Sequence, residues 1–199
     1  MTLQEIPSEQ FRERCIPVLE TERLVLRAPR LGDAKAVAVL ANDRHIAENT
    51  SRIPHPYRAA DAEDFIATAN LGSEAVFMIC LRTGVPIGAC GFTQVDRHPP
   101  EIGYWLGVKN WGKGYATEAV RAMIDHTFTD LDCEAIQSAA RVTNPAWLRV
   151  LEKCGFQWTG ADLLRVRAIA SSAPIDRFRL DRGLWASLKS WGQARRIAV

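Results

Sequence analysis

An alternating run of residues that leads through a glycine-rich turn into a helix constrains this chain more than any other feature. Residues 101–108 read Glu-Ile-Gly-Tyr-Trp-Leu-Gly-Val, and residues 111–118 read Trp-Gly-Lys-Gly-Tyr-Ala-Thr-Glu. The first turn of a helix leaves backbone N–H groups unpaired at the positive end of its dipole, and glycine lets an anion approach them closely. The pattern therefore predicts a strand, a turn and a helix that together bind a phosphate group.

Two common nucleotide-binding motifs fit this turn poorly. Gly107, Gly112 and Lys113 have Walker A spacing, but Gly114 replaces the hydroxyl residue that binds Mg²⁺. A dinucleotide-binding fingerprint can start at Gly112, but Thr117 stands where the third glycine or alanine is required. Neither the NTPase or kinase class nor the dinucleotide-binding class is therefore favoured.

The turn resembles instead the pyrophosphate loop of the GNAT superfamily of N-acetyltransferases. Residues 144–156, from Asn144 to Phe156, resemble the second signature of that family, an asparagine-containing helix that ends in Glu-Lys-x-Gly-Phe. Residues 19–27, Leu-Glu-Thr-Glu-Arg-Leu-Val-Leu-Arg, resemble the first strand of the ribosomal-protein N-terminal acetyltransferase (RimJ/RimL-like) branch. Three motifs in family order, over residues 19–190, make the resemblance specific.

The resemblance implies an α/β (α+β) fold with a central mixed, mostly antiparallel sheet of six or seven strands flanked by helices. In this fold the strands at 101–108 and 134–142 splay apart and form the acyl-CoA cleft. We expect an N-terminal arm at 1–18, a single acetyltransferase domain at 19–191 and a C-terminal tail at 192–199.

Local patterns predict the individual elements. Alternation of apolar residues predicts the strands, and apolar stripes with caps predict the helices, with Asp33 and Asn144 as N-caps. Asn49, Pro54 and Pro56 predict a long loop at 43–58. The predicted strands are 19–28, 75–81, 86–93, 101–108, 135–142, 156–159 and 175–180, and the predicted helices are 33–42, 60–70, 114–128, 144–154 and 183–191.

The resemblance also implies a reaction, in which a primary amine attacks the thioester of acetyl-CoA directly in a ternary complex. The acceptor is either a protein N-terminal α-amine or a small-molecule amine. Backbone groups of residues 106–108 pair with the pantetheine arm, the turn binds the pyrophosphate, and Asn144 contacts the arm or serves only as an N-cap. The implied cofactor-binding residues are Leu106, Gly107, Val108, Trp111, Gly112, Lys113, Gly114, Tyr115, Ala116, Thr117 and Asn144.

A primary amine must lose a proton before it attacks, because its pKa is about 8 to 10. Glu101 occupies the position where related enzymes often carry the base, although a solvated glutamate at a strand end is the alternative. The loop residues His55 and Tyr57 are candidate acceptor-binding residues.

The general acid is missing from its usual positions. The tyrosine that many relatives carry is Leu151 here, and the serine of the ribosomal-protein branch is Trp147. Tyr104, Tyr115 and Cys154 are possible substitutes. A second function therefore stays open, that of a non-catalytic acyl-CoA-binding or regulatory protein with the same fold.

Composition excludes several other classes. The net charge of +2, without blocks of like charge, argues against a nucleic-acid partner, and scattered histidines argue against a metal site. Five cysteines without C-x-x-C spacing indicate reduced thiols in a cytoplasmic protein. We expect no signal peptide and no membrane association, since no long apolar run occurs. Exposed sheet edges of this fold often pair, so a homodimer is compatible with the sequence.

Overall fold

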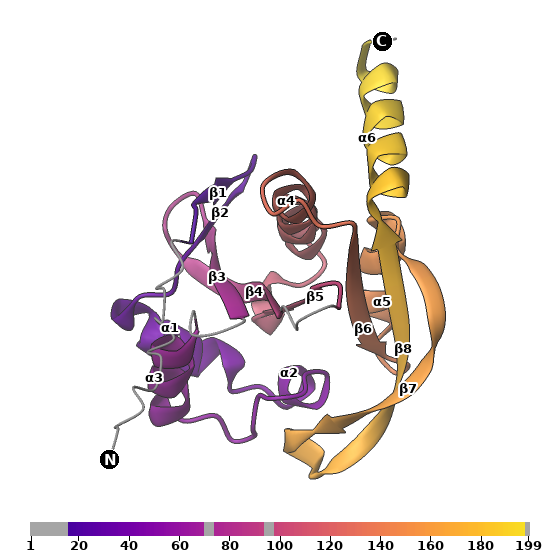
Figure 1. Cartoon of the computed structure of the whole chain (residues 1–199). Helices are drawn as coiled ribbons and strands as arrows, with labels where there is room; N and C mark the ends of the chain where they lie inside the picture. Colours follow the sequence, from indigo (N-terminus) through magenta and orange to yellow (C-terminus); the bar gives the residue numbers. More distant parts are fainter. Residues whose placement is uncertain (1–15, 70–73, 94–97, 198–199) are drawn as a thin grey trace, which may run out of the picture.

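A single sheet forms the centre of the molecule in the computed structural model, which describes residues 16–69, 74–93 and 98–197 (Figure 1). Residues 1–15 of the predicted arm and 198–199 of the predicted tail lie outside the described residues. The sheet has eight strands in the order β1-β2-β3-β4-β5-β6-β8-β7. The strands are β1 (Leu19–Glu20), β2 (Leu24–Arg27), β3 (Glu74–Leu81), β4 (Pro86–Thr93), β5 (Glu101–Leu106), β6 (Ala135–Arg141), β7 (Gln157–Val166) and β8 (Ser171–Asp181).

Helices cover both faces of the sheet (Figure 1). Ile102 and Leu106 of β5 pack into a large cluster with α4, whereas Trp105 faces a smaller cluster with α1 and α3. Each fully buried Leu or Phe of these clusters contributes about 1.5–3 kcal/mol of transfer free energy. The helices are α1 (Ala34–Ala41), α2 (Arg44–Glu48), α3 (Ala59–Thr68), α4 (Tyr115–Thr129), α5 (Pro145–Lys153) and α6 (Arg182–Ile197).

The sheet divides between β5 and β6. The first five strands form antiparallel ladders, and so do β6, β8 and β7. β5 and β6 run parallel and are paired only at Glu101 and Gln137. The two halves therefore diverge beyond this pair, as the resemblance implies for this fold.

Two glycines permit close packing at the divergence. A Cβ atom on Gly88 would lie 2.2 Å from the Trp105 carbonyl oxygen, and one on Gly107 would lie 2.4 Å from Leu40 Cδ2. Larger residues at these positions would therefore push β5 away from β4 or from α1.

The structure corrects several predicted boundaries in the first half of the chain. The predicted strand 19–28 is two short antiparallel strands, β1 and β2, because the chain turns at Thr21, whose hydroxyl accepts from Leu24 N at 2.9 Å. This division raises the strand count from the predicted seven to eight. The predicted loop 43–58 contains α2, whose N-cap Asp43 accepts from His45 N at 2.8 Å.

Asp33 precedes α1 as predicted, but its carboxylate does not cap that helix. It accepts two 2.8 Å hydrogen bonds from the Arg27 guanidinium and one from Arg30 N. Arg27 on β2 therefore binds the Asp33 side chain, which the local sequence predicted to cap α1.

Other elements differ in length. β5 ends at Leu106, because Val108–Asn110 form a short 3-10 turn in place of the predicted strand end. β7 and β8 are much longer than the predicted strands 156–159 and 175–180, and they form a hairpin at the end of the sheet. α6 extends beyond the predicted helix 183–191.

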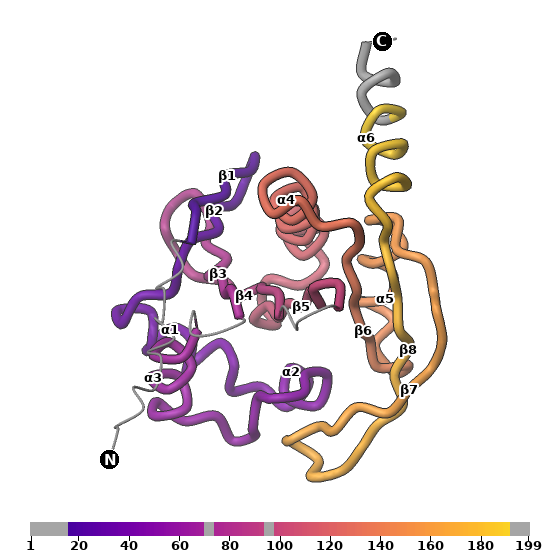
Figure 2. The backbone as a smooth tube through the Cα atoms, viewed as in Figure 1, coloured from indigo at the N-terminus to yellow at the C-terminus, as the bar shows by residue number. Residues whose placement is uncertain are grey.

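The segment that contains α2 lies between β2 and β3 in the chain and contacts the second half of the sheet. It passes below β5 and reaches the tip of the β7–β8 hairpin (Figure 2). Arg167 N donates to Ser51 O at 3.0 Å, and Arg141 Nη1 donates to Glu48 O at 2.5 Å. These contacts bound the space beneath the divergence.

Candidate active site

The diverging strands open into a cavity of about 1210 Å³. β5, the turn at 111–114, the first turns of α4 and α5, and the segment from His45 to Tyr57 line it. This volume exceeds that of most small-molecule sites, so it has room for a large cofactor and a second ligand.

The glycine-rich turn leaves helix N–H groups open to this cavity. Gly112 and Gly114 adopt positive φ angles of 72° and 81°, and Gly114 is the N-cap of α4 without any side-chain cap. The N–H groups of the first helical turn therefore have no intrahelical acceptor and no capping oxygen. Five of the predicted turn residues line the cavity beside Trp111: Gly112, Gly114, Tyr115, Ala116 and Thr117.

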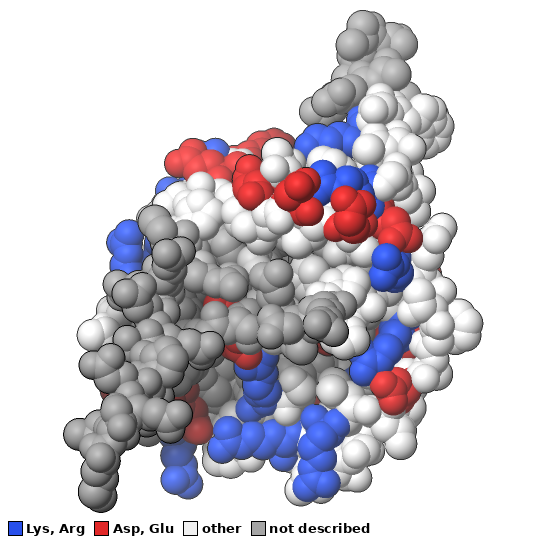
Figure 3. Space-filling view, viewed as in Figure 1, with Lys and Arg blue, Asp and Glu red and all other residues white. Residues whose placement is uncertain are grey.

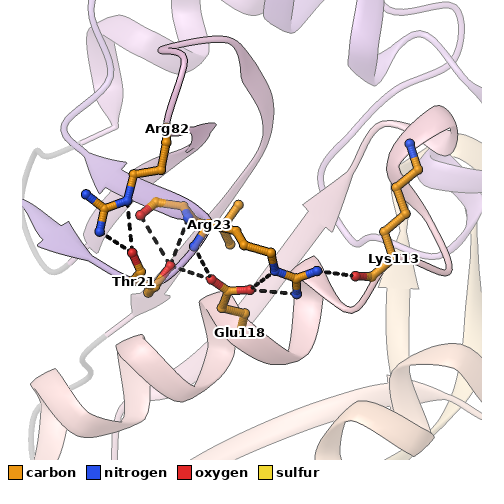
Figure 4. A network of polar contacts seen from close by, with 6 residues as sticks. Thr21, Arg23, Arg82, Lys113 and Glu118 are labelled. Carbon is orange, nitrogen blue, oxygen red and sulfur yellow. Dashed lines mark hydrogen bonds and ion pairs between the residues drawn. The ribbon is translucent and has the colours of Figure 1, made fainter.

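Three of the predicted cofactor residues do not belong to the cavity lining: Gly107, Val108 and Lys113. Gly107 is buried, whereas Val108 and Lys113 are exposed. The Lys113 side chain points away from the polar network beside the turn (Figure 4). Val108 lies in the 3-10 turn rather than on the strand edge, which explains its different position.

That network joins the turn to the hairpin of β1 and β2 (Figure 4). Arg23 Nη1 donates to Lys113 O at 2.9 Å, and Arg23 Nε donates to Glu118 Oε2 at 2.7 Å. The other carboxylate oxygen of Glu118 accepts from Thr21 Oγ1 at 2.6 Å and from Arg23 N at 2.8 Å. Burial alone raises the pKa of Glu118, but these hydrogen bonds outweigh it, so the pKa is lowered.

The β4–β5 register decides which β5 backbone groups face the gap. Gly107 N donates to Ile87 O at 2.9 Å, so this pair is hydrogen-bonded. Because such pairs alternate along an antiparallel ladder, Ile102, Tyr104 and Leu106 direct their backbone groups toward β6. The N–H of Gly107, predicted to pair with the pantetheine arm, is thus directed into the sheet.

Two indole groups satisfy carbonyl oxygens on the diverging edges. Trp111 Nε1 donates to Leu106 O at 2.7 Å. On the other side, the β6–β8 register turns the backbone groups of Ala139 toward β5, and Trp147 Nε1 donates to Ala139 O at 2.8 Å. Each edge therefore has a carbonyl bonded to an indole instead of to the opposite strand.

Tyr104 lies beside Trp147 and lines the cavity. The two rings meet edge to face with centroids 4.6 Å apart. Burial raises the pKa of Tyr104 to about 12, so its hydroxyl stays protonated at neutral pH. Cys154, whose pKa burial raises to about 11, and Leu151 lie outside the cavity lining.

Asn144 lines the cavity and caps α5. Its Oδ1 accepts from Trp147 N at 3.1 Å, and Pro145 occupies the first turn as predicted. Its side-chain carbonyl is therefore engaged in the cap.

Glu101 begins β5 at the point where the strands still touch, and its side chain lines the cavity. It is 46% exposed, and its Oε2 lies 3.4 Å from Arg177 Nη1. Arg177 also pairs with Asp162 at 2.8 Å. An ion pair thus tethers this carboxylate at the cavity mouth.

The two predicted acceptor residues occupy different places. Tyr57 lines the cavity, but it is buried and its hydroxyl donates to Asp61 O at 3.1 Å. His55 is exposed and is not part of the lining. Carboxylates that line this end beside Glu101 are Asp61, Asp64 and Glu74.

Several lining residues escaped the sequence analysis. Arg149 and Lys153, one helical turn apart on α5, bring positive charge to the cofactor side of the cavity. Their spacing of four residues on the predicted helix places them on one face, which was a usable signal. Asp64 and Glu74 carried none, because only the tertiary fold brings α3 and β3 to the same cavity.

A family model described as an acetyltransferase (GNAT) domain matches residues 23–157, which include the turn and the α5 motif. The chain belongs to the GNAT family. It is 34% identical over 164 residues to the uncharacterized N-acetyltransferase p20 of Bacillus licheniformis, a match that covers 79% of this chain and 91% of p20. The predicted family, enzyme class and cofactor are confirmed: this GNAT protein is an N-acetyltransferase that uses acetyl-CoA.

Solved structures share the GNAT fold. RimL, an α-N-protein acetyltransferase of a ribosomal protein solved with coenzyme A, superposes with a TM-score of 0.72 at 17% identity and covers 83% of this chain and 98% of its own. Spermidine N-acetyltransferase from Vibrio cholerae, solved with coenzyme A and spermine, gives 0.70 at 21% identity and covers 83% and 99%. At these identities the likeness concerns the fold alone.

Charged side chains are distributed unevenly over the surface (Figure 3). Positive and negative side chains alternate along the upper rim, and Lys and Arg gather at the lower edge over α2 and the hairpin tip (Figure 3). Within the described ranges, no helix is both long and apolar enough to span a bilayer. The same residues contain no group of three His, Cys, Asp or Glu side chains able to hold a metal ion.

Proposed function

We propose that the cavity binds acetyl-CoA and an amine together, and that residues 19–191 form the catalytic domain. One observation carries this proposal: an uncapped helix N-terminus and an unpaired strand gap open into the same cavity. The pyrophosphate binds the N–H groups of the 112–117 turn without a metal, and Arg149 and Lys153 add positive charge.

The pantetheine arm extends from the turn along the edge of β5. It pairs with Tyr104 and with the N–H of Leu106 in the manner of an added strand. These groups face β6, whereas the Leu106 carbonyl is bonded to Trp111 and Gly107 N to Ile87. The thioester then lies in the gap, close to Tyr104 and below the first turn of α5.

The amine enters from the side of α3, where Asp61 and Asp64 line the cavity, and attacks the thioester carbonyl carbon. Glu101 accepts the proton of the ammonium group, directly or through water, so that the nitrogen lone pair is free. The attacking nitrogen of the tetrahedral intermediate releases its second proton to water, and collapse of the intermediate breaks the C–S bond and expels the CoA thiolate.

Tyr104 is the best-supported donor to the departing thiolate among the three substitutes. It lines the cavity, and burial raises its pKa to about 12, so the hydroxyl is protonated at neutral pH but is a weaker acid than a free tyrosine. Tyr115 lies under the Arg23 guanidinium at 4.8 Å, and Cys154 lies outside the lining. A thiolate leaves without full protonation when its pKa is near 8.5, so this step needs only modest assistance.

The acceptor is a cationic amine, either a protein N-terminus or a small polyamine. Asp61 and Asp64 support this class, because carboxylates at the acceptor end attract an ammonium group, whereas Glu74 is paired with Arg52. RimL and spermidine N-acetyltransferase represent these two acceptor types on the same fold.

The alternative function, a non-catalytic acyl-CoA-binding protein, was suggested by Trp147 and Leu151 at the usual donor positions, and it conflicts with the N-acetyltransferase class of this family member. Release of CoA thiol from acetyl-CoA, measured across peptides with free N-termini, polyamines and aminoglycosides, separates the two. We expect turnover with at least one amine class and a lower kcat in Tyr104→Phe. Tight acetyl-CoA binding with no turnover on any amine would favour the binding protein.

A further inference from the structure

The β1–β2 hairpin motif has no role in the chemistry described so far. Its Thr21 and Arg23 nevertheless contact the 112–117 turn and the first turn of α4, which lie 90 residues or more away along the chain (Figure 4). The hairpin and the turn are therefore in contact at the point where the cofactor's negative charge is bound.

The Arg23 guanidinium uses its donors on both sides of the turn. Nη1 bonds Lys113 O, while Nε and Nη2 each lie 2.7 Å from Glu118 Oε2. The group also lies over the Tyr115 ring at 4.8 Å, and Nη2 would be 3.3 Å from a Cβ on Gly114. Arg23 thus contacts the turn before, at and after the start of α4.

Its bond to Lys113 fixes the orientation of a peptide group. In a trans peptide the C=O of one residue and the N–H of the next point in opposite directions. Because Arg23 holds Lys113 O, the Gly114 N–H is directed away from Arg23. Gly114 lines the cavity, so this orientation keeps a donor available to a bound anion.

Its bonds to Glu118 control charge. A carboxylate in the first turn of α4 interacts favourably with the positive end of the helix dipole. The same carboxylate repels a pyrophosphate bound at that end. The pKa of Glu118 is lowered, so the group stays charged at neutral pH. Its side chain is only 16% exposed, so water screens this charge poorly. Arg23 is the neighbouring positive group that balances it.

We propose that Arg23 is a positioning residue for the pyrophosphate turn. It orients the Lys113–Gly114 peptide and neutralises Glu118, so that the turn presents N–H groups without a repelling carboxylate. This inference depends on the proposed function, because it assumes that the pyrophosphate binds at 112–117.

The test is calorimetric titration of CoA into the full chain and into Arg23→Ala. Arg23→Ala loses the bond to Lys113 O and both contacts with Glu118 Oε2, so the CoA Kd should rise by about 10- to 100-fold. Arg82→Ala is the matched control, because Arg82 bonds Glu20 and Thr21 of the same hairpin without contacting the turn. Its Kd should stay within about twofold of the original chain.

A double variant separates charge from general loosening of the fold. Glu118→Gln in the Arg23→Ala background removes the unbalanced carboxylate, so it should recover about threefold or more of the lost CoA affinity. A merely structural role for Arg23 would instead give a further loss in the double variant.

The results of these titrations test the role of Arg23 separately from the proposed function. An original chain that does not bind CoA overturns the proposed function. Normal CoA binding with an unchanged Kd in Arg23→Ala, or further loss in the double variant, overturns only the role of Arg23. If Arg23→Ala does not fold, Arg23→Lys is used: a single ammonium cannot reproduce the guanidinium's bonds to both Lys113 O and Glu118, and the Kd should rise by about 3- to 10-fold.

Discussion

The indole Nε1 of Trp147 donates a 2.8 Å hydrogen bond to the carbonyl oxygen of Ala139, on the edge of β6 that faces the strand gap. The ribosomal-protein branch of the family has a serine at the position of Trp147. Here the larger residue satisfies a backbone acceptor that has no partner strand, and it packs against Tyr104. Trp147, which stands where a candidate acid is expected, therefore has a structural role at the strand gap.

Trp147→Phe tests that use, because it keeps the aromatic packing and removes only the donor. Ala139 is half-buried, so loss of this hydrogen bond should lower the free energy of unfolding by about 0.5–1.5 kcal/mol in urea titrations. Trp158→Phe is the control, since its Nε1 bonds Asp176 from a 62% exposed side chain. Equal losses in the two variants would contradict the assignment.

Gly114→Leu should weaken acetyl-CoA binding by more than about tenfold, because a side chain at this N-cap occupies the space of the anion. Gly84→Leu supplies the matched control: its φ of 86° imposes the same backbone strain in a hairpin turn away from the cavity. Both variants should lose stability, and only Gly114→Leu should lose affinity in calorimetry. Similar affinities would argue against anion binding at the turn.

Glu101→Gln should lower kcat by about 10²- to 10⁴-fold and leave the acetyl-CoA Kd nearly unchanged. Asp162→Asn, which removes the other partner of Arg177, should retain most of the activity. An unaltered kcat in Glu101→Gln would remove Glu101 from the catalytic residues and leave the transferase reaction intact.

The Arg27–Asp33 pair predicts a pH dependence of stability. The Arg27 hydrogen bond lowers the pKa of Asp33 in the folded protein, and burial opposes this only in part. The stabilisation is therefore complete above the unfolded-state pKa of about 3.9, and it is lost as the pH falls through the lower, folded-state pKa.

Asp33→Asn measures this contribution. At pH 7 the variant should be about 3 kcal/mol less stable in urea, since it leaves Arg27 without its charged partner. Below about pH 4 the difference from the original chain should shrink. Glu48→Gln, which breaks an exposed pair with Arg44, should change stability little. A difference that stays constant down to pH 2.5 would exclude Asp33 as the titrating group.

Local signals predicted the elements that hold the cofactor turn and the signature helix. Asn144, Pro145 and Gly155 specify α5 through a cap, a first-turn proline and a left-handed stop, and the structure confirms each of them. Gly112 and Gly114 marked the turn for the same reason, because positive φ angles are largely reserved for glycine.

Features that depend on tertiary contacts were not predicted. Asp33 had the sequence of a helix cap, but Arg27 on β2 binds it instead. The Arg23–Glu118 bond joins residues 95 positions apart. No local pattern encodes such a contact. The register of β5 likewise decided that Tyr104, rather than Gly107, faces the gap.

Titration of acetyl-CoA into the full chain in the presence of a metal chelator tests the central claim most directly. The account places the pyrophosphate on backbone N–H groups and a helix dipole, which need no Mg²⁺. It therefore predicts a Kd in the micromolar range, with one acetyl-CoA bound per chain and the same affinity after Mg²⁺ is added. Absence of micromolar binding, or binding that requires Mg²⁺, would contradict the account.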